Sequence, residues 1–329
     1  MAAWRGAQIY RQYRKIAGSD PPPDPGQRLS PMSPNTDTPK WRDHLFVAFQ
    51  KILPTRLLSS LMFHIAQSRN PLLSRALIRY FARRYDIRLA ECEFERLVNY
   101  DSFAHFFTRG LKSDARLPSR DADALSSPVD GTVSQIGQLQ TGRLIQAKGR
   151  LYSAADLLHD AAVADEFISG SFATIYLSPR DYHRVHMPVD GQLRHWTYVP
   201  GRLFSVNPAT VRALPDLFLR NERLCAIFDT AFGPLAVVMV GAMIVGGLET
   251  VWTGRVTPPH RRDHEPSLYR SMEPIQLKRG AELGRFNIGS TVILLFPRDA
   301  ANWRKEIVAG VSVRMNQPLA QINRYRVKK

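Results

Sequence analysis

Between residues 41 and 117, apolar side chains recur at the three- and four-residue spacing of amphipathic helices. Three segments carry this pattern: DHLFVAFQKILP, TRLLSSLMFHIAQS and PLLSRALIRYFARRYD. Pro54 and Pro71 fall at positions where helices can begin. In the third segment, one helix face is expected to carry Leu73, Leu77, Tyr80 and Phe81. The pattern predicts a helical region over residues 41–117.

From about residue 118 the apolar runs become short, and glycine or proline separates them. They read as strands: GTVSQIGQL, RLIQAKG, FATIYLS, GQLRHWTYVPG, RLCAIFDT and STVILLFP. Two stretches keep helical spacing, SAADLLHDAAVADEFI and VRALPDLFLR. The predicted fold class is therefore α+β, with N-terminal amphipathic helices followed by a mainly β domain over residues 118–329.

Residues 230–248 imitate a membrane span because they are apolar and carry no charge. However, Gly233-Pro234, Gly241 and Gly246-Gly247 divide the stretch into pieces of strand length. The pieces LAVVMV and AMIVGGLETVW are rich in β-branched residues. We therefore expect two buried strands here and no transmembrane helix.

The first 40 residues have a different composition from the rest of the chain. Residues 1–18 contain four basic residues and no acid, and no apolar signal-peptide core follows them. They are interpreted as a basic tail near a membrane surface, with a mitochondrial transit peptide as the alternative. Residues 19–40 are rich in Pro, Ser and Asp and predict a disordered linker.

Charge narrows the choice of partner. Lys and Arg outnumber Asp and Glu by 45 to 29, a formal charge of +16, which favours an anionic partner. From Lys40 to Arg88 there are ten basic residues and two acids. Basic amphipathic helices suit an anionic bilayer, although an ordinary helical subdomain with a solvated basic face has the same composition. No nucleic-acid-binding motif is present, so a nucleic-acid partner is less favoured than a membrane.

The two cysteines, Cys92 and Cys225, exclude a disulfide scaffold and lack the spacing of a zinc site. A reducing compartment is compatible with them.

Two histidines, His183 and His186, lie three residues apart in YHRVHMPVDG, after a predicted strand. Such a pair can bind a metal, act as acid and base, or sit in a structured loop. A zinc site needs a third ligand. His260 and His264 are candidates, but their segment, TPPHRRDHEP, reads as a surface loop.

Two further segments carry candidate chemistry. Asp130, between proline and glycine in SSPVDGTVSQIG, is either a turn residue or an acid that orients a histidine. Gly289 and Ser290 open the last apolar strand in GRFNIGSTVILLFP. No GxSxG elbow is present, so the usual hydrolase arrangement is not supported. A serine Oγ at such a glycine can instead attack the preceding carbonyl, if a histidine held by an aspartate takes its proton.

Together these segments resemble the phosphatidylserine decarboxylase proenzymes of the bacterial membrane-associated type. The resemblance covers the chain from about residue 41 and is densest over residues 126–296. The segments that carry it are RLIQAKGRLYS, YLSPRDYHRVHMP, YVPGRLFSVN, LFLRNERLCAIFDTAFGPLAVVMVGAMIVGGLETVW and GRFNIGST. Where the family usually has LGST, this chain has Ile288 before the glycine, a conservative change.

The resemblance implies a chain that cuts itself between Gly289 and Ser290, giving a β subunit, 1–289, and an α subunit, 290–329. Asp130, His186 and Ser290 are implied as the self-cleavage triad, and Ser290 is implied to become a covalent pyruvoyl group. That pyruvoyl cofactor would form a Schiff base with phosphatidylserine and allow its decarboxylation to phosphatidylethanolamine, a step of phospholipid biosynthesis. His183 is implied to assist decarboxylation or reprotonation.

The resemblance also implies a lyase that needs no metal and no diffusible cofactor. Its expected partners are phosphatidylserine, an anionic membrane surface and its own second subunit, with no nucleic acid. Its expected place is the cytoplasmic side of the cell membrane, as a peripheral protein. Two alternatives remain: a zinc-dependent hydrolase that uses His183 and His186, and a non-catalytic membrane-binding module that kept the fold.

Overall fold

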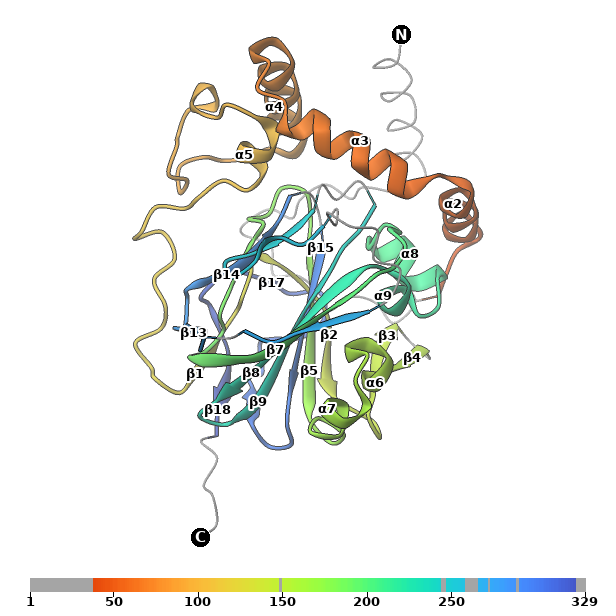
Figure 1. The fold of residues 1–329 in the computed structure, drawn as a ribbon, viewed down its shortest axis with the longest axis vertical. Helices are drawn as coiled ribbons and strands as arrows, with labels where there is room; N and C mark the ends of the chain where they lie inside the picture. Colours follow the sequence, from red (N-terminus) through yellow and green to blue (C-terminus); the bar gives the residue numbers. More distant parts are fainter. Residues whose placement is uncertain are drawn as a thin grey trace.

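A β domain with helices along one end makes up the part of the chain that the structure, a computed structural model, describes (Figure 1). The described residues are 38–147, 150–243, 247–257, 266–271, 273–287 and 290–323. The basic tail and most of the predicted linker, residues 1–37, lie outside them, as do Ile288, Gly289, His260 and His264. The α+β prediction is confirmed.

The main sheet contains nine strands among the described residues and runs through the centre of the domain. Its neighbours pair antiparallel throughout. In spatial order the strands are β12 (Ser267–Tyr269), β7 (Gly191–Val199), β8 (Arg223–Thr230), β9 (Gly233–Val240), β15 (Ser290–Phe296), β5 (Ser171–Leu177), β2 (Gly131–Gln138) and β17 (Ser312–Val313), and β13 (Gln276–Leu277) pairs with β7.

Strand β15 lies between β9 and β5 and is buried along its whole length. Its side chains alternate between two apolar clusters because successive residues of a strand point to opposite faces. Val292 and Leu294 join one cluster, and Ile293 and Leu295 join the other. Such a continuous apolar run is expected for a strand covered on both faces.

Three smaller sheets complete the β structure of the described residues. The first contains β11 (Gly254–Arg255), β10 (Leu248–Thr250), β14 (Glu282–Phe286) and β6 (Arg184–His186). The second contains β1 (Ala124–Ser126), β18 (Pro318–Ile322) and β16 (Ala301–Trp303), and the third is the hairpin of β3 (Arg143–Ala147) and β4 (Arg150–Ser153). Val185 of β6 and Phe286 of β14 pack in the same cluster as Val292, so the first small sheet covers that face of the main sheet.

The long helices are α2 (Trp41–Ile52), α3 (Thr55–Gln67) and α4 (Pro71–Tyr85), and the short ones are η1 (Leu97–Asn99), α5 (Phe103–Phe107), α6 (Ala154–Leu158), α7 (Ala161–Asp165), α8 (Pro208–Ala213) and α9 (Leu217–Arg220). The three long helices, α6, α7, α8 and α9 fall on or overlap the predicted helical segments, whereas η1 and α5 lie outside them. At the start of α4, Asn70 accepts hydrogen bonds from two backbone amides and Pro71 fills the first turn, which confirms the predicted start.

Helix α2 packs directly on the β domain through its polar residues. The Gln50 side chain donates to Thr210 of α8 and accepts from the backbone N–H of Ser205. At the other end of the helix, Asp43 pairs with Arg212 of α8 at 3.1 Å. These buried contacts fix the helix in one orientation, because Gln50 and Asp43 cannot leave their partners without losing hydrogen bonds.

The first of the two strands predicted from the apolar stretch 230–248 is present, and the second is a strand only over Leu248–Thr250, with residues 244–246 outside the described residues. Residues 233–240 form β9, and β10 begins at Leu248. None of the helices in the described ranges is both long and apolar enough to cross a membrane. The glycine positions therefore predicted strands here more reliably than the overall hydropathy, which suggested a membrane helix.

Candidate active site

Ser290 is the first residue of β15 and is completely buried. Its Oγ atom has no hydrogen-bond partner among the described residues. Ser290 lies opposite Leu177, the last residue of β5. A buried hydroxyl without a partner loses the hydrogen bonds that water would give it, and Ser126 and Ser171 share this state. What distinguishes Ser290 is its place directly after Gly289, at the junction that the family resemblance implies is cut.

His183 is also completely buried and follows β5 by a short loop. Its Nδ1 lies 2.8 Å from the carbonyl oxygen of Asp181, so Nδ1 carries the proton and donates. Its Nε2 is then the bare, proton-accepting atom, and it has no partner in the described part of the chain. Burial, aided by the positive charge of Arg109, lowers the pKa of His183 to about 3. The ring is therefore neutral at physiological pH.

The loop that precedes His183 is held from two sides. The carboxylate of Asp181 accepts hydrogen bonds from the backbone N–H and the hydroxyl of Ser178, both at 2.7 Å. Arg109 donates to the carbonyl oxygens of Arg180 and Asp181, at 2.8 and 3.0 Å. The Asp181 carbonyl thus receives both Arg109 and His183, which fixes the imidazole orientation and its tautomer.

The residues around α5 connect the helical region to this loop. The ring of Phe107 lies 4.1 Å from that of His183, centroid to centroid. The next residue, Thr108, accepts a hydrogen bond from Arg184 through its carbonyl oxygen. Residues 107–109 therefore cover the imidazole and exclude water from it.

His186, on β6, has both ring nitrogens engaged. Nδ1 donates to the carbonyl oxygen of Gly280 at 2.8 Å, and Nε2 accepts from the hydroxyl of Tyr182 at 2.9 Å. Burial lowers the pKa of His186, although the hydrogen bond to Gly280 acts in the opposite direction. The ring is oriented by a backbone carbonyl in this structure, a role that the sequence analysis gave to Asp130.

Asp130 precedes β2 and has two partners of its own. Its Oδ1 accepts from the backbone N–H of Met315 at 2.7 Å, and its Oδ2 lies 3.3 Å from Arg116. Arg116 also pairs with Glu91 at 2.7 Å. The hydrogen bonds of the described residues do not join Asp130 to His186. The triad of Asp130, His186 and Ser290 therefore stays a prediction.

Strand register brings the predicted residues to one end of the main sheet. Tyr176 of β5 pairs with Thr132 of β2 on one side and with Thr291 of β15 on the other. Asp130 precedes Thr132 by two residues and Ser290 precedes Thr291 by one, so both leave the sheet at the same end. The loop that carries His183 leaves β5 at this end as well.

Several residues of this end were not singled out from the sequence: Phe107, Arg109, Arg116, Asp181 and Tyr182. Phe107, Arg109 and Arg116 lie in the segment that was assigned to the helical region, so only tertiary contacts reveal them. Tyr182 precedes His183 in the YHRVH segment. Only its position next to His183, which was singled out, could have drawn attention to Tyr182 in the sequence.

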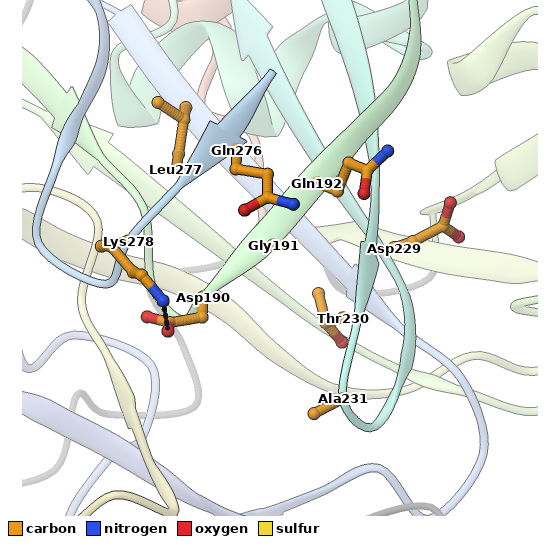
Figure 2. A pocket seen from close by; sticks show the side chains of 9 residues that line it. All are labelled: Asp190, Gly191, Gln192, Asp229, Thr230, Ala231, Gln276, Leu277 and Lys278. Carbon is orange, nitrogen blue, oxygen red and sulfur yellow. Dashed lines mark hydrogen bonds and ion pairs between the residues drawn. The ribbon is translucent and has the colours of Figure 1, made fainter. Parts of the chain in front are cut away.

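A separate pocket of about 300 Å³ lies at the opposite end of the main sheet (Figure 2). It is lined in part by Thr230 and Ala231, at the turn between β8 and β9. Its charged groups have partners: Lys278 pairs with Asp190 at 2.9 Å, and Asp229 pairs with Arg194 at 2.6 Å. This pocket offers no free reactive group and is not the candidate active site.

The described residues contain no group of three or more His, Cys, Asp and Glu side chains that could hold a metal ion. His183 and His186 are instead engaged separately, with different partners. The other histidines considered for zinc, His260 and His264, lie outside the described residues.

Comparisons with known proteins match this chain over most of its length. The family model for phosphatidylserine decarboxylase matches residues 103–321, and a second model, PSD, matches residues 45–86. The chain is similar to the phosphatidylserine decarboxylase proenzyme of Nitrosococcus oceani, with 50% identity over 289 residues, covering 88% of this chain and 94% of that protein. It is similar to the proenzyme of the same name from Pseudomonas fluorescens strain Pf0-1, with 49% identity over 287 residues, covering 86% and 99%.

Proposed function

The chain belongs to the phosphatidylserine decarboxylase family, and from this premise we propose that it converts phosphatidylserine to phosphatidylethanolamine in phospholipid biosynthesis. One observation supports this proposal and identifies the atoms involved. Ser290 Oγ and His183 Nε2 are both buried without partners, on segments that leave the main sheet at the same end. Ser290 supplies the nucleophile for self-cleavage, and His183 supplies an unpaired base at the same end of the sheet for the later decarboxylation.

We propose that the chain first cuts itself between Gly289 and Ser290. Ser290 Oγ attacks the Gly289 carbonyl carbon, and the peptide C–N bond breaks to leave an ester. A base then removes the Cα proton of residue 290, the Cβ–Oγ bond breaks, Gly289 leaves as a carboxylate, and dehydroalanine remains. Dehydroalanine tautomerises to an imine, to which water adds. This hydrolysis releases ammonia and leaves a pyruvoyl group at the start of the α subunit.

In this proposal His186 takes the Ser290 proton and Asp130 holds the ring. Both residues have other partners in this structure: Tyr182 and Gly280 for His186, Arg116 and Met315 for Asp130. Assembly of the triad therefore requires that His186 release Tyr182 and that Asp130 turn from Arg116.

The residues at Ser290 suit a pyruvoyl group. Its carbonyl, when formed, supplies the electron sink that decarboxylation needs. The backbone of β15 anchors the position by pairing with β5 and β9. Phe107 and His183 line a region from which water is excluded. His183, neutral and with Nε2 bare, can accept a proton there and return it to the product.

The two subunits are proposed to remain together after cleavage. Strand β15 of the α subunit lies between β9 and β5 of the β subunit, and β18 pairs with β1. Separation would expose a fully buried strand and leave its backbone groups unpaired. The free-energy cost of both changes keeps the subunits together after the peptide bond is cut.

The enzyme is proposed to act as a peripheral protein on the cytoplasmic side of the cell membrane. On α2, the exposed fractions are 67% for Trp41, 57% for Leu45, 48% for Phe49 and 84% for Ile52. These four residues, named here the α2 stripe, share one face because they are spaced by four, four and three residues. Leu57 and Leu61 of α3 and Leu72 of α4 are exposed as well. Exposed apolar residues on basic helices suit an anionic bilayer.

We propose a chain organised as a tail (residues 1–40), a membrane-associating helical region (41–117) and a decarboxylase domain (118–329). The contact of Phe107 with His183 joins the helical region directly to the candidate active site of the decarboxylase domain. Phosphatidylserine presented at the helices would then be close to the site that α5 covers.

Intact mass measurement of the denatured protein, with a decarboxylation assay on phosphatidylserine, tests the proposal. We expect two polypeptides, the smaller beginning with a pyruvoyl group in place of Ser290, and release of carbon dioxide that a metal chelator does not reduce. Asp130→Asn and His186→Ala should leave most of the chain uncut. A folded, uncut wild-type chain without activity would overturn the function, and normal cutting in either variant would remove that residue from the triad.

A further inference from the structure

A cavity of about 320 Å³ lies beside the end of α2 and is lined, among the described residues, by Lys51, Arg202, Phe204 and Arg220. It lies at the same end of the main sheet as Ser290, displaced across β9 and β8, because Thr291 pairs with Val240 and the next residue, Gly241, donates its N–H to Glu222. Lys51 comes from the last turn of α2 and Arg220 from the end of α9. Arg202 and Phe204 come from the segment between β7 and α8. Three of the four described lining residues are thus cations, and none of these four is an acid.

The backbone holds two of these cations next to each other. The N–H of Arg202 donates to the carbonyl oxygen of Arg220 at 2.7 Å, and Arg202 forms a parallel bridge with Asn221. The Asn221 side chain also binds the backbone N–H and carbonyl of Phe204, at 3.0 and 2.8 Å. The fold therefore holds the backbones of both arginines next to each other.

Two acids near these cations in sequence have partners elsewhere, while a third, Asp216, lies at the start of α9 and makes no ion pair with the described residues. Asp43 pairs with Arg212, and Glu222 accepts a hydrogen bond from Tyr198. Across the described ranges, no ion pair joins Lys51, Arg202 or Arg220 to an acid. The one side-chain hydrogen bond given for them runs from Arg220 Nε to the carbonyl oxygen of Pro215. Three neighbouring positive charges repel one another, and a bound anion would relieve that repulsion.

The position of the cavity selects the source of the anion. Lys51 directly precedes Ile52, the most exposed member of the α2 stripe. Gln50, on its other side, is buried against the β domain. Lys51 therefore lies on the flank of the helix, between the stripe and the protein. When an amphipathic helix lies in a bilayer surface, its flanks are level with the lipid headgroups.

We propose that Lys51, Arg202 and Arg220 form a site for the phosphate of a phospholipid headgroup, beside the end of α2 and two strands across the sheet from Ser290. This inference rests on the proposed membrane docking of the α2 stripe. The bound lipid acts as a fixed anchor and is not decarboxylated. It selects anionic lipids because one phosphate leaves part of the positive charge uncompensated.

Vesicle sedimentation tests the site, with pure phosphatidylcholine vesicles and vesicles that also contain phosphatidylglycerol, which is not the substrate. We expect wild-type protein to prefer the anionic vesicles. Removing one cation near a membrane surface weakens binding about fivefold, so Arg202→Gln with Arg220→Gln should weaken it about 25-fold. Arg298→Gln with Lys305→Gln removes the same charge from exposed positions beyond the far end of β15 and is the matched control.

A loss equal to that of the control variant would overturn the site, because only overall charge would then matter. Arg202→Gln alone guards against misfolding, since the Arg202 side chain makes no hydrogen bond with another described residue. Ile52→Ser with Phe49→Ser tests the docking separately: it should reduce binding to both kinds of vesicle. If it does not, the docking proposal fails, whatever the pocket variants show.

Inorganic phosphate distinguishes a lipid from a free anion. A higher melting temperature in phosphate, absent in the double arginine variant, together with a selective loss of anionic vesicle binding, supports a headgroup site. Phosphate binding in the pocket without any change in vesicle binding would overturn the lipid assignment in favour of a soluble phosphate.

Discussion

Strand β15 and helix α2 are both rich in large apolar residues, yet the molecule treats them in opposite ways. All seven residues of β15 are buried, on both faces. In α2, Trp41 and Ile52 are mostly exposed, whereas Phe46 and Val47 are buried. The strand has neighbours on each edge and a layer on each face. The helix has the β domain on one side only.

The two elements have different roles: β15 stabilises the core, and α2 presents an apolar surface to the outside. Burial of β15 anchors Ser290 and, in the proposed processed enzyme, joins the two subunits. The exposure of α2 leaves apolar area that no other described residue covers, which is costly in water and available to a bilayer. Apolar composition alone does not tell these roles apart.

The largest expected effect concerns the two ends of the sheet. Ser290→Ala should leave one uncut chain with no decarboxylase activity, because the nucleophile that starts the cleavage is gone. Ser171→Ala is the matched control: Ser171 is also buried with an unpartnered hydroxyl, but it lies opposite Phe296 at the far end of β15. Intact mass measurement should show cutting in the control alone. Cutting of the Ser290 variant would show that the cleavage point is misassigned.

Two phenylalanines of α2 compare its faces directly. Phe46→Ala should lower the free energy of unfolding by about 3–5 kcal/mol, because it leaves a cavity in a packed interface. Phe49→Ala should change it by less than about 0.5 kcal/mol, since Phe49 is exposed. Vesicle binding should show the opposite order, with Phe49→Ala the weaker binder. Denaturant unfolding and sedimentation measure the two effects, and equal losses in both assays would remove the distinction between the faces.

A smaller effect is expected from the buried histidine when the pH falls. His183 has a pKa of about 3 when folded, whereas a histidine in the unfolded chain has a pKa near 6.5. Between these values the unfolded state binds more protons, so stability rises with pH and is lost as pH falls. From pH 7 to pH 5 the loss is about 2 kcal/mol. In the uncut Ser290→Ala background, His183→Gln should remove that part of the loss, and an unchanged pH dependence would contradict a buried neutral imidazole.

The smallest effect is expected at the N-terminus. Deleting residues 1–37 should change decarboxylase activity on vesicles by less than about twofold, because α2 begins at Trp41 and its contacts with α8 remain. A steady-state assay of the truncated enzyme tests this expectation. A much larger loss would place the tail, rather than the α2 stripe alone, in the membrane contact.

Helix α4 shows how far local pattern goes. The spacing of apolar residues correctly predicted the helix, but the residues that face the protein are Ser74, Ile78 and Ala82. Leu73 and Tyr80, which were expected to share an apolar face, are exposed. Periodicity defines the faces of a helix, but what covers each face depends on segments elsewhere in the chain.

The candidate site divides in the same way. The residues of the predicted chemistry could be named from the sequence because each sits in a dense local motif. Their partners could not, because Arg109 reaches the Asp181 carbonyl across 72 positions of the chain and Arg116 reaches Asp130 across 14. The tertiary structure also gave His186 a tyrosine and a backbone carbonyl as partners, which no spacing rule contains.

The sequence by itself determined the α+β class, the strands in the apolar stretch 230–248 and the family, since these depend on short-range periodicity, glycine positions and contiguous motifs. Only the tertiary structure decided which apolar residues stay exposed on α2, which nitrogen of His183 is bare and which cations share a cavity. The physical reason is that burial and hydrogen bonding depend on distant segments packing together, and a linear pattern does not record which segments meet.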